Sequence, residues 1–199
     1  SGTGVPLWTN ASSGTAIALD ASGNVFVTGS SGGDYATIAY SGAGVPLWTN
    51  RYDGPQNGDD VAKALAVDAN GNVFVTGSSS SVGFTDDSDY ATIAYSGAGV
   101  PLWTNRYNGP ARAMAVDASG HVFLTGYLPG EGTTIAYTGA GVPLWTNRYN
   151  GPGSLQTDPS LAIGSDNTLY VTTSAGLSPS DCDFVTVKYV WRTEIAIQL

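Results

Sequence analysis

The sequence predicts an all-β fold made of repeated antiparallel sheets, because two hairpin-like segments recur along the chain. The sixteen residues YATIAYSGAGVPLWTN occur at 35–50 and again at 90–105, and residues 133–147 read TTIAYTGAGVPLWTN. In each copy, aromatic and β-branched residues flank a turn bracketed by glycines. This pattern is typical of a β-hairpin.

A second hairpin pattern lies between these copies. It reads ALAVDANGNVFVTGS at residues 64–78, and related segments occupy 16–30, 113–127 and 161–174. Aspartate, asparagine and glycine occupy the central turn, as tight turns require. Each repeat unit therefore contains four strands, which we name a, b, c and d in chain order.

A four-stranded unit that recurs every 40 to 55 residues is the pattern of a propeller blade. The motif GVPLWTN, which contains strand d, begins at residues 4, 44, 99 and 141. The strands are apolar on both faces, as residues 73–77 show, and such a sheet must pack between two others. We predict an all-β fold, a β-propeller of four four-stranded antiparallel blades in a-b-c-d strand order, as a single domain over residues 1–199. The predicted parts are blade repeats at about 11–52, 61–107, 111–149 and 160–189, an N-terminal d strand at 5–10 and a C-terminal tail at 190–199.

The fourth unit has strands a, b and c but no d strand of its own. Two segments compete for that place, residues 5–10 (VPLWTN) and residues 194–199 of the tail (EIAIQL). We expect residues 5–10 to close the ring, because EIAIQL lacks the tryptophan of the d strand and the VWRT that precedes it lacks the glycines of a tight turn. If the tail fills the place instead, residues 5–10 are available to complete another copy of the chain by strand addition, which would build a head-to-tail assembly.

Composition and charge exclude several classes of partner. Charged residues are 12% of the chain, and 16 acidic residues against 7 basic ones give a net charge of −9. This balance argues against nucleic acid and anionic membrane surfaces, which bind clustered lysine and arginine. No apolar run approaches the roughly 20 residues of a membrane helix, so we expect no membrane insertion. The low lysine content and the many glycine, serine and threonine residues favour an extracellular or cell-surface location.

The loops between strands b and c and between strands d and a lie at the same end of the blades. These loops differ between units and contain most of the carboxylates, so we expect any site on this loop face. Its candidate ligand-binding residues belong to the repeated Asn-Arg-Tyr-Asx-Gly-Pro segment and are Arg51, Tyr52, Arg106, Tyr107, Arg148 and Tyr149. Alternatively, the segment is a capping turn in which the arginine pairs with a nearby carboxylate.

The loop at residues 78–89 contains the candidate metal ligands Asp86, Asp87 and Asp89. Hard cations bind several carboxylates together, so these residues form a possible calcium site; a solvated acidic loop is the other reading. We expect no other cofactor. We also assign no catalytic residue, because His121 replaces a turn asparagine and forms no nucleophilic pair with Cys182, the single cysteine.

The segments AVDANGNVFVTG (66–77) and DYATIAYSGAGVPLWTNRYNGP (89–110) resemble the SBBP repeats, a β-propeller family of bacterial secreted and surface proteins. The VDxxGNVxV core is also similar to NHL-type blades. The resemblance extends to Tyr189. It implies seven blades, whereas four repeat units are present here, and it implies no shared catalytic residues.

These observations predict a non-enzymatic extracellular module for binding or surface assembly that uses the loop face, with a glycan or protein as its ligand. Self-assembly through the N-terminal strand or the C-terminal tail is a further expectation. Two alternatives stay open. One is a structural subunit of a filament or surface layer built by strand exchange, and the other is a propeller hydrolase or lyase that acts on polysaccharide or peptide.

Overall fold

All regular structure in the described part of the chain is β-strand. The structure is a computed structural model that describes residues 4–55, 57–80, 88–128, 131–150, 154–155, 159–178 and 181–190. None of these residues forms a helix, so this part of the chain contains no helix that could cross a membrane.

Three four-stranded antiparallel sheets follow one another along the chain, and in each the strands are hydrogen-bonded in sequence order. The first sheet contains β1 (Ala16–Leu19), β2 (Val25–Ser31), β3 (Asp34–Tyr40) and β4 (Pro46–Tyr52). The second contains β5 (Asp60–Val67), β6 (Val73–Ser80), β7 (Ser88–Tyr95) and β8 (Pro101–Asn108). The third contains β9 (Ala111–Val116), β10 (Val122–Leu128), β11 (Glu131–Tyr137) and β12 (Pro143–Tyr149). These sheets confirm the predicted strand order a-b-c-d.

The fourth sheet is built differently around its central strand, β15 (Thr168–Ser178). On one edge of β15, β14 (Ser160–Ile163) pairs with residues 169–172, and the short β13 (Ser154–Leu155) pairs with residues 175–176. β16 (Asp181–Val190) pairs with the other edge. Strands β14, β15 and β16 are the predicted a, b and c, whereas β13 was not predicted. Within the described residues, no d strand follows β16.

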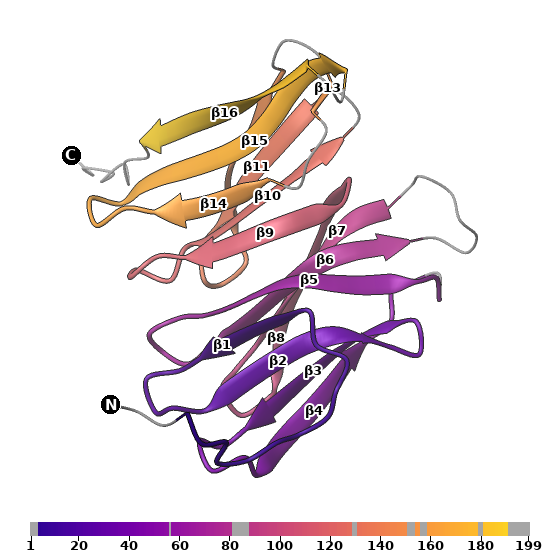
Figure 1. Cartoon of the computed structure of the whole chain (residues 1–199), viewed down its shortest axis with the longest axis vertical. Coiled ribbons are helices and arrows are strands. Elements are labelled where there is room, and N and C mark those ends of the chain that lie inside the picture. The colour runs from indigo at the N-terminus through magenta and orange to yellow at the C-terminus, as the bar shows by residue number, and fades with distance from the viewer. Residues whose placement is uncertain are drawn as a thin grey trace, which may run out of the picture.

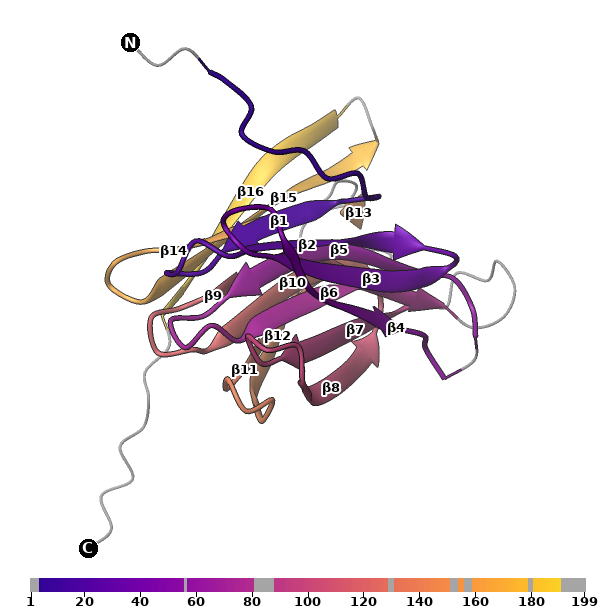
Figure 2. The same cartoon turned by 90° about the horizontal axis from the view of Figure 1, so that it is seen from below.

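The four sheets are stacked along the longest axis of the molecule (Figure 1), with the first and fourth sheets at opposite ends. Seen along this axis, the a strands β1, β5 and β9 lie toward one side of the stack and the d strands β4, β8 and β12 toward the other (Figure 2). The structure therefore contains the four predicted blades as an open stack.

Apolar side chains fill the space between each pair of adjacent sheets. Val73 and Val75 on β6 pack toward the first sheet in a cluster with Phe26, whereas Phe74 packs toward the third sheet with Val122. The three β6 side chains are 0% exposed. A strand that buries both faces in this way confirms that each blade depends on two neighbours.

The d strands of the first and second sheets each bind the next sheet through a tryptophan and an asparagine. The ring of Trp48 lies between Phe26 of its own sheet and Tyr95 of the next, 5.9 Å from each ring centroid. Trp48 Nε1 donates to the carbonyl oxygen of Gly97 at 2.9 Å, and Asn50 Nδ2 donates to that of Gly99 at 2.7 Å. We call this arrangement the Trp–Asn clamp; Trp103 and Asn105 repeat it on the third sheet.

The N-terminal segment forms the same clamp, although residues 4–14 form no strand. Trp8 Nε1 donates to the carbonyl oxygen of Gly42 at 3.1 Å, Asn10 Nδ2 donates to that of Gly44 at 2.9 Å, and the Trp8 ring lies 6.1 Å from Tyr40. The segment therefore lies where the d strand of a blade preceding the first would lie.

The predicted closure of the ring by residues 5–10 is not confirmed. Residues 5–10 are held against the first sheet by the clamp, and in the described residues they do not pair with β16. The first and fourth sheets lie at opposite ends of the stack (Figure 1), so a segment that is held against the first sheet lies away from the fourth.

We predict that Gly99→Ala destabilises the protein more than Gly71→Ala does. Both glycines have a positive φ, 81° and 80°, which costs a non-glycine residue about 1–2 kcal/mol. A Cβ on Gly99 would lie 2.7 Å from the Trp48 ring, whereas a Cβ on Gly71 would meet nothing within 4 Å. The difference in unfolding free energy, measured by urea denaturation, should be about 1–3 kcal/mol. Equal losses would show that the clamp does not depend on this close contact.

Candidate functional site

The candidate residues on the loop face form a ladder of hydrogen bonds between adjacent sheets. Arg106 Nη1 donates to the hydroxyl oxygen of Tyr52 at 2.9 Å and to Ser79 Oγ at 2.7 Å. Its Nη2 forms an ion pair with Asp89 at 3.0 Å. Burial lowers the pKa of Arg106, but the hydrogen bonds to Tyr52 and Asp89 outweigh that effect and hold the pKa above its ordinary value.

The next step of the ladder has the same form. Arg148 Nη2 donates to the hydroxyl oxygen of Tyr107 at 2.9 Å, and its Nε lies 3.3 Å from a carboxylate oxygen of Glu131. The tyrosine rings are held by aromatic contacts, with Tyr52 5.4 Å from Tyr35 and Tyr107 5.9 Å from Tyr90.

Arg51 occupies the same strand position but has a different set of partners. Its guanidinium donates to the carbonyl oxygen and the hydroxyl of Ser31, and it lies 3.4 Å from Asp34. Ala11 and Ser12 occupy the N-terminal positions that correspond to Arg51 and Tyr52, so no tyrosine precedes Arg51 in the ladder.

The structure therefore brings the candidate arginines and tyrosines of adjacent sheets together, and each of the three arginines lies beside a carboxylate, as the alternative reading expected. Binding of a glycan or protein by Arg51, Tyr52, Arg106, Tyr107, Arg148 and Tyr149 stays a prediction.

Two groups of acidic residues on the loop face are candidate cation sites. Asp86 and Asp87 of the predicted calcium site lie outside the described residues, and Asp89 is paired with Arg106, so that site stays a prediction. Asp34, Asp53 and Asp60 converge elsewhere on the same face, and the sequence did not indicate them as a group. Burial raises the pKa of Asp60, and the hydrogen bond that its carboxylate accepts from the amide of Gly54 lowers it only in part.

The outward surface of the fourth sheet has aromatic residues at the positions where interior blades bury aromatic residues, although Lys188 replaces an alanine. We call this surface, which contains Tyr170, Phe184 and Lys188, the fourth-sheet face. Phe184 pairs with a serine of strand b, as Tyr35 and Tyr90 do in the first and second sheets, so the three aromatic residues occupy equivalent positions. Those two tyrosines are 2% and 1% exposed against the following sheet, whereas Phe184 is 93% exposed.

The opposite end of the stack exposes the matching surface. We call it the first-sheet face; it contains Ile17, Leu19, Val27, Ala36 and Ile38. Ile17 and Leu19 are 64% and 62% exposed, although the corresponding Leu65 and Val67 pack against the preceding sheet. A groove on this face is lined by Val27, Ala36 and Ile38 together with Ser12, Ser13, Ser31, Thr49 and Arg51.

Comparison with known proteins supports the fold. The family model described as a β-propeller repeat (SBBP) matches residues 51–85, so the chain contains a repeat of this family, as expected. No curated protein matches the chain.

Solved structures resemble the chain at low identity. A protein of unknown function from Bacteroides caccae is 13% identical with a TM-score of 0.55, and the match covers 87% of this chain and 60% of that one. A putative gluconolactonase (15% identity, TM-score 0.45) is covered over 57% of its length and 86% of this chain. A gluconolactonase from Xanthomonas campestris (14%, 0.47) is covered over 56% of its length and 87% of this chain. The chain thus spans less than two thirds of each structure, and the two gluconolactonase matches carry no argument about activity.

We predict that Tyr52→Phe destabilises the protein by about 1 kcal/mol, because it removes the hydroxyl that accepts a hydrogen bond from Arg106. Tyr52→Ala should cost more, since it also removes the ring that packs on Tyr35. Urea denaturation of both variants measures the difference. An alanine variant as stable as the wild type would show that Tyr52 is not part of the packing and would favour its availability to a ligand.

Proposed function

We propose that the protein is a non-enzymatic, extracellular assembly module in which a second copy of the chain continues the stack of blades. The fourth-sheet face of one copy packs on the first-sheet face of the next. Residues 5–10 of the second copy then serve as the d strand of the first copy's fourth blade. The clamp formed by Trp8 and Asn10 carries this proposal.

Trp8 already has half of the environment of an interior clamp tryptophan. Tyr40 covers one side of its ring, as Tyr95 does for Trp48. Phe26 lies on the other side of Trp48, and Tyr170 is the corresponding residue of the fourth sheet. Trp8 is 38% exposed, and so is Tyr170. A second copy that brings its Tyr170 to Trp8 would complete the clamp.

Phe184 and the groove on the first-sheet face are also complementary, because equivalent residues pack together between the first and second sheets. Tyr35, which corresponds to Phe184, is buried in the second sheet in a cluster with Val75, Ala91 and Ile93. The register of the strands makes Val27, Ala36 and Ile38 the equivalents of those three residues. The groove they line is therefore the place where an interior blade receives the aromatic ring of the blade before it. Burial of an aromatic side chain at each end supplies the driving force.

Two copies would place eight blades in one ring, within the range of about four to eight blades that propellers contain. The contact is heterologous, because the two faces that meet are different, and such a contact forms a closed ring when its rotation permits. The side chain of Lys188 disfavours this contact between copies, because it places a charge on the fourth-sheet face. Lys188 occupies the position of Ala39 and Ala94, and its ammonium lies 5.5 Å above the Tyr170 ring.

We predict that sedimentation velocity over a range of concentrations will show a species of twice the 20.4 kDa chain mass. Phe184→Asp and Ile17→Asp should each favour the monomer, because a charge would be buried in the contact. Both side chains are exposed in the single chain, so the melting temperature of the dilute variants should not fall. Phe184→Tyr is the matched control and should associate like the wild type, and Lys188→Ala should associate more tightly.

Mixing the two aspartate variants tests whether the faces are different. An equimolar mixture should restore a dimer with one intact contact, since one variant retains the first-sheet face and the other the fourth-sheet face. Deletion of residues 1–10 should also prevent association while leaving the chain folded. A wild-type chain that stays monomeric at high concentration would contradict the proposal and would favour the loop face as the functional surface. Ordered long polymers in place of dimers would favour the filament alternative.

The hydrolase or lyase alternative predicts turnover of polysaccharide or peptide that is lost when loop carboxylates are replaced. The assembly proposal predicts no turnover in a hydrolase panel. Turnover that survives repeated purification and disappears in loop variants would contradict it.

A further inference from the structure

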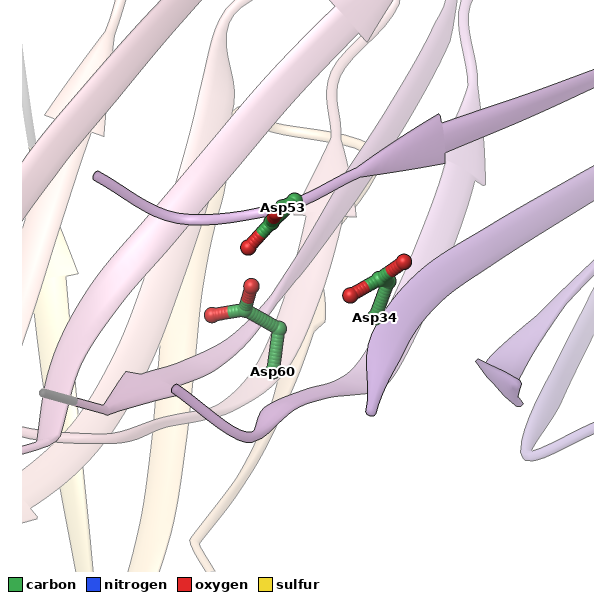
Figure 3. Close-up of side chains that lie close together, drawn as sticks. All are labelled: Asp34, Asp53 and Asp60. Carbon is green, nitrogen blue, oxygen red and sulfur yellow. The ribbon is translucent and has the colours of Figure 1, made fainter. Parts of the chain in front are cut away.

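Three carboxylates from separate segments meet at the junction of the first and second sheets. Asp34 begins β3, Asp53 directly follows β4, and Asp60 begins β5. One ligand oxygen from each lies within 4.8 Å of the other two. Figure 3 shows the three carboxylates pointing toward one another.

Asp60 is fixed in place but only partly satisfied. Its backbone N–H donates to the carbonyl oxygen of Gly33 at 2.6 Å, and its Oδ2 accepts from the N–H of Gly54 at 2.6 Å. The residue is 0% exposed, and among the described residues no hydrogen-bond partner reaches Oδ1. A buried carboxylate oxygen without a partner is costly, so its presence indicates that a further group completes the site.

Nearby cations leave most of the negative charge uncompensated. Within the described residues, one ion pair reaches the cluster, between Arg51 and Asp34 at 3.4 Å, and the Arg51 side chain is 52% exposed. Arg106 lies nearby but directs its hydrogen bonds to Tyr52, Ser79 and Asp89. The cluster therefore combines several negative charges with a buried oxygen that has no donor.

We propose that Asp34, Asp53 and Asp60 bind a divalent cation of the calcium class and so join the first sheet to the second. Calcium takes six to eight oxygen ligands at about 2.3–2.6 Å, so three carboxylate oxygens within 4.8 Å of one another can contact the same ion. Magnesium usually keeps several waters and is bound by only one or two carboxylates, so three protein carboxylates favour calcium. The ion supplies the missing partner of Asp60 Oδ1, and water completes its coordination.

The chain contains one such site in its described part, because the other junctions lack the same residues. At the junction of the second and third sheets, Asp89 corresponds to Asp34, but Asn108 and Gly109 stand in place of Asp53 and Asp60. The strand register fixes this alignment, because Ala62 pairs with Gly77 in the second sheet as Ala111 pairs with Gly126 in the third. This cluster therefore accounts for one ion in the described part of the chain.

The test is calcium binding by isothermal titration calorimetry, together with thermal unfolding in calcium and in chelator. For the wild type we expect one ion per chain and, at a calcium concentration 100 times Kd, a melting temperature about 5–10 °C above that in chelator. Terbium luminescence sensitised by the nearby tyrosines provides an independent reading of the site.

Asp60→Asn should abolish the calcium-dependent shift while leaving the chelated protein at least as stable, because it removes a buried charge without changing the side-chain shape. If this variant fails to fold, Asp53→Asn at an exposed position tests the same site and should weaken binding about tenfold or more.

Asp59→Asn is the matched control, since it removes one charge from the same loop outside the cluster; Asp89→Asn is the control for the loop at residues 78–89. Both should retain the wild-type shift. The same shift in Asp60→Asn and Asp53→Asn as in the wild type, or no wild-type shift at millimolar calcium, would overturn the proposal.

Discussion

The structure depends on one constraint, which is that each sheet has two apolar faces and needs a neighbour on both sides. The inter-sheet clusters satisfy it in the interior of the stack, where Val73, Phe74 and Val75 of a single strand are buried toward opposite neighbours. The Trp–Asn clamp and the arginine–tyrosine ladder then fix adjacent sheets at two separate places. The turn glycines follow from the same constraint, because a side chain at Gly99 would meet the ring of Trp48.

The two ends of the stack have faces similar to those of the interior sheets, apart from Lys188, but lack the neighbours that would cover them. An exposed phenylalanine at one end and a groove with the residues that bury its equivalent at the other are complementary, which makes a second copy of the chain the proposed occupant. The cation site has a related origin, since its three carboxylates belong to strands and loops that meet only when the first two sheets pack together. Both proposals therefore concern how blades are joined, and neither depends on the other.

The sequence predicted the repeated architecture well, because a hairpin pattern is local and the four units repeat it. The segment at residues 64–78 was sufficient to place β5 and β6, and the two-sided apolar pattern predicted the stacking of sheets. Closure of the ring of blades could not be predicted in the same way, since it depends on the rotation angle between adjacent sheets. The exposed Phe184 could have been noticed by aligning DFVTVKY with DYATIAY, whereas the meeting of Asp34, Asp53 and Asp60 could not, because sequence spacing gives no distance.

The central claim is that the terminal sheets gain their missing neighbours from another copy. Hydrogen exchange measured at low and high protein concentration tests it most directly, since it reports protection strand by strand. The account predicts that protection of β16 and of residues 5–10 increases with concentration, while β6 and β7 in the interior do not change. Exchange in β16 and residues 5–10 that is independent of concentration would contradict it.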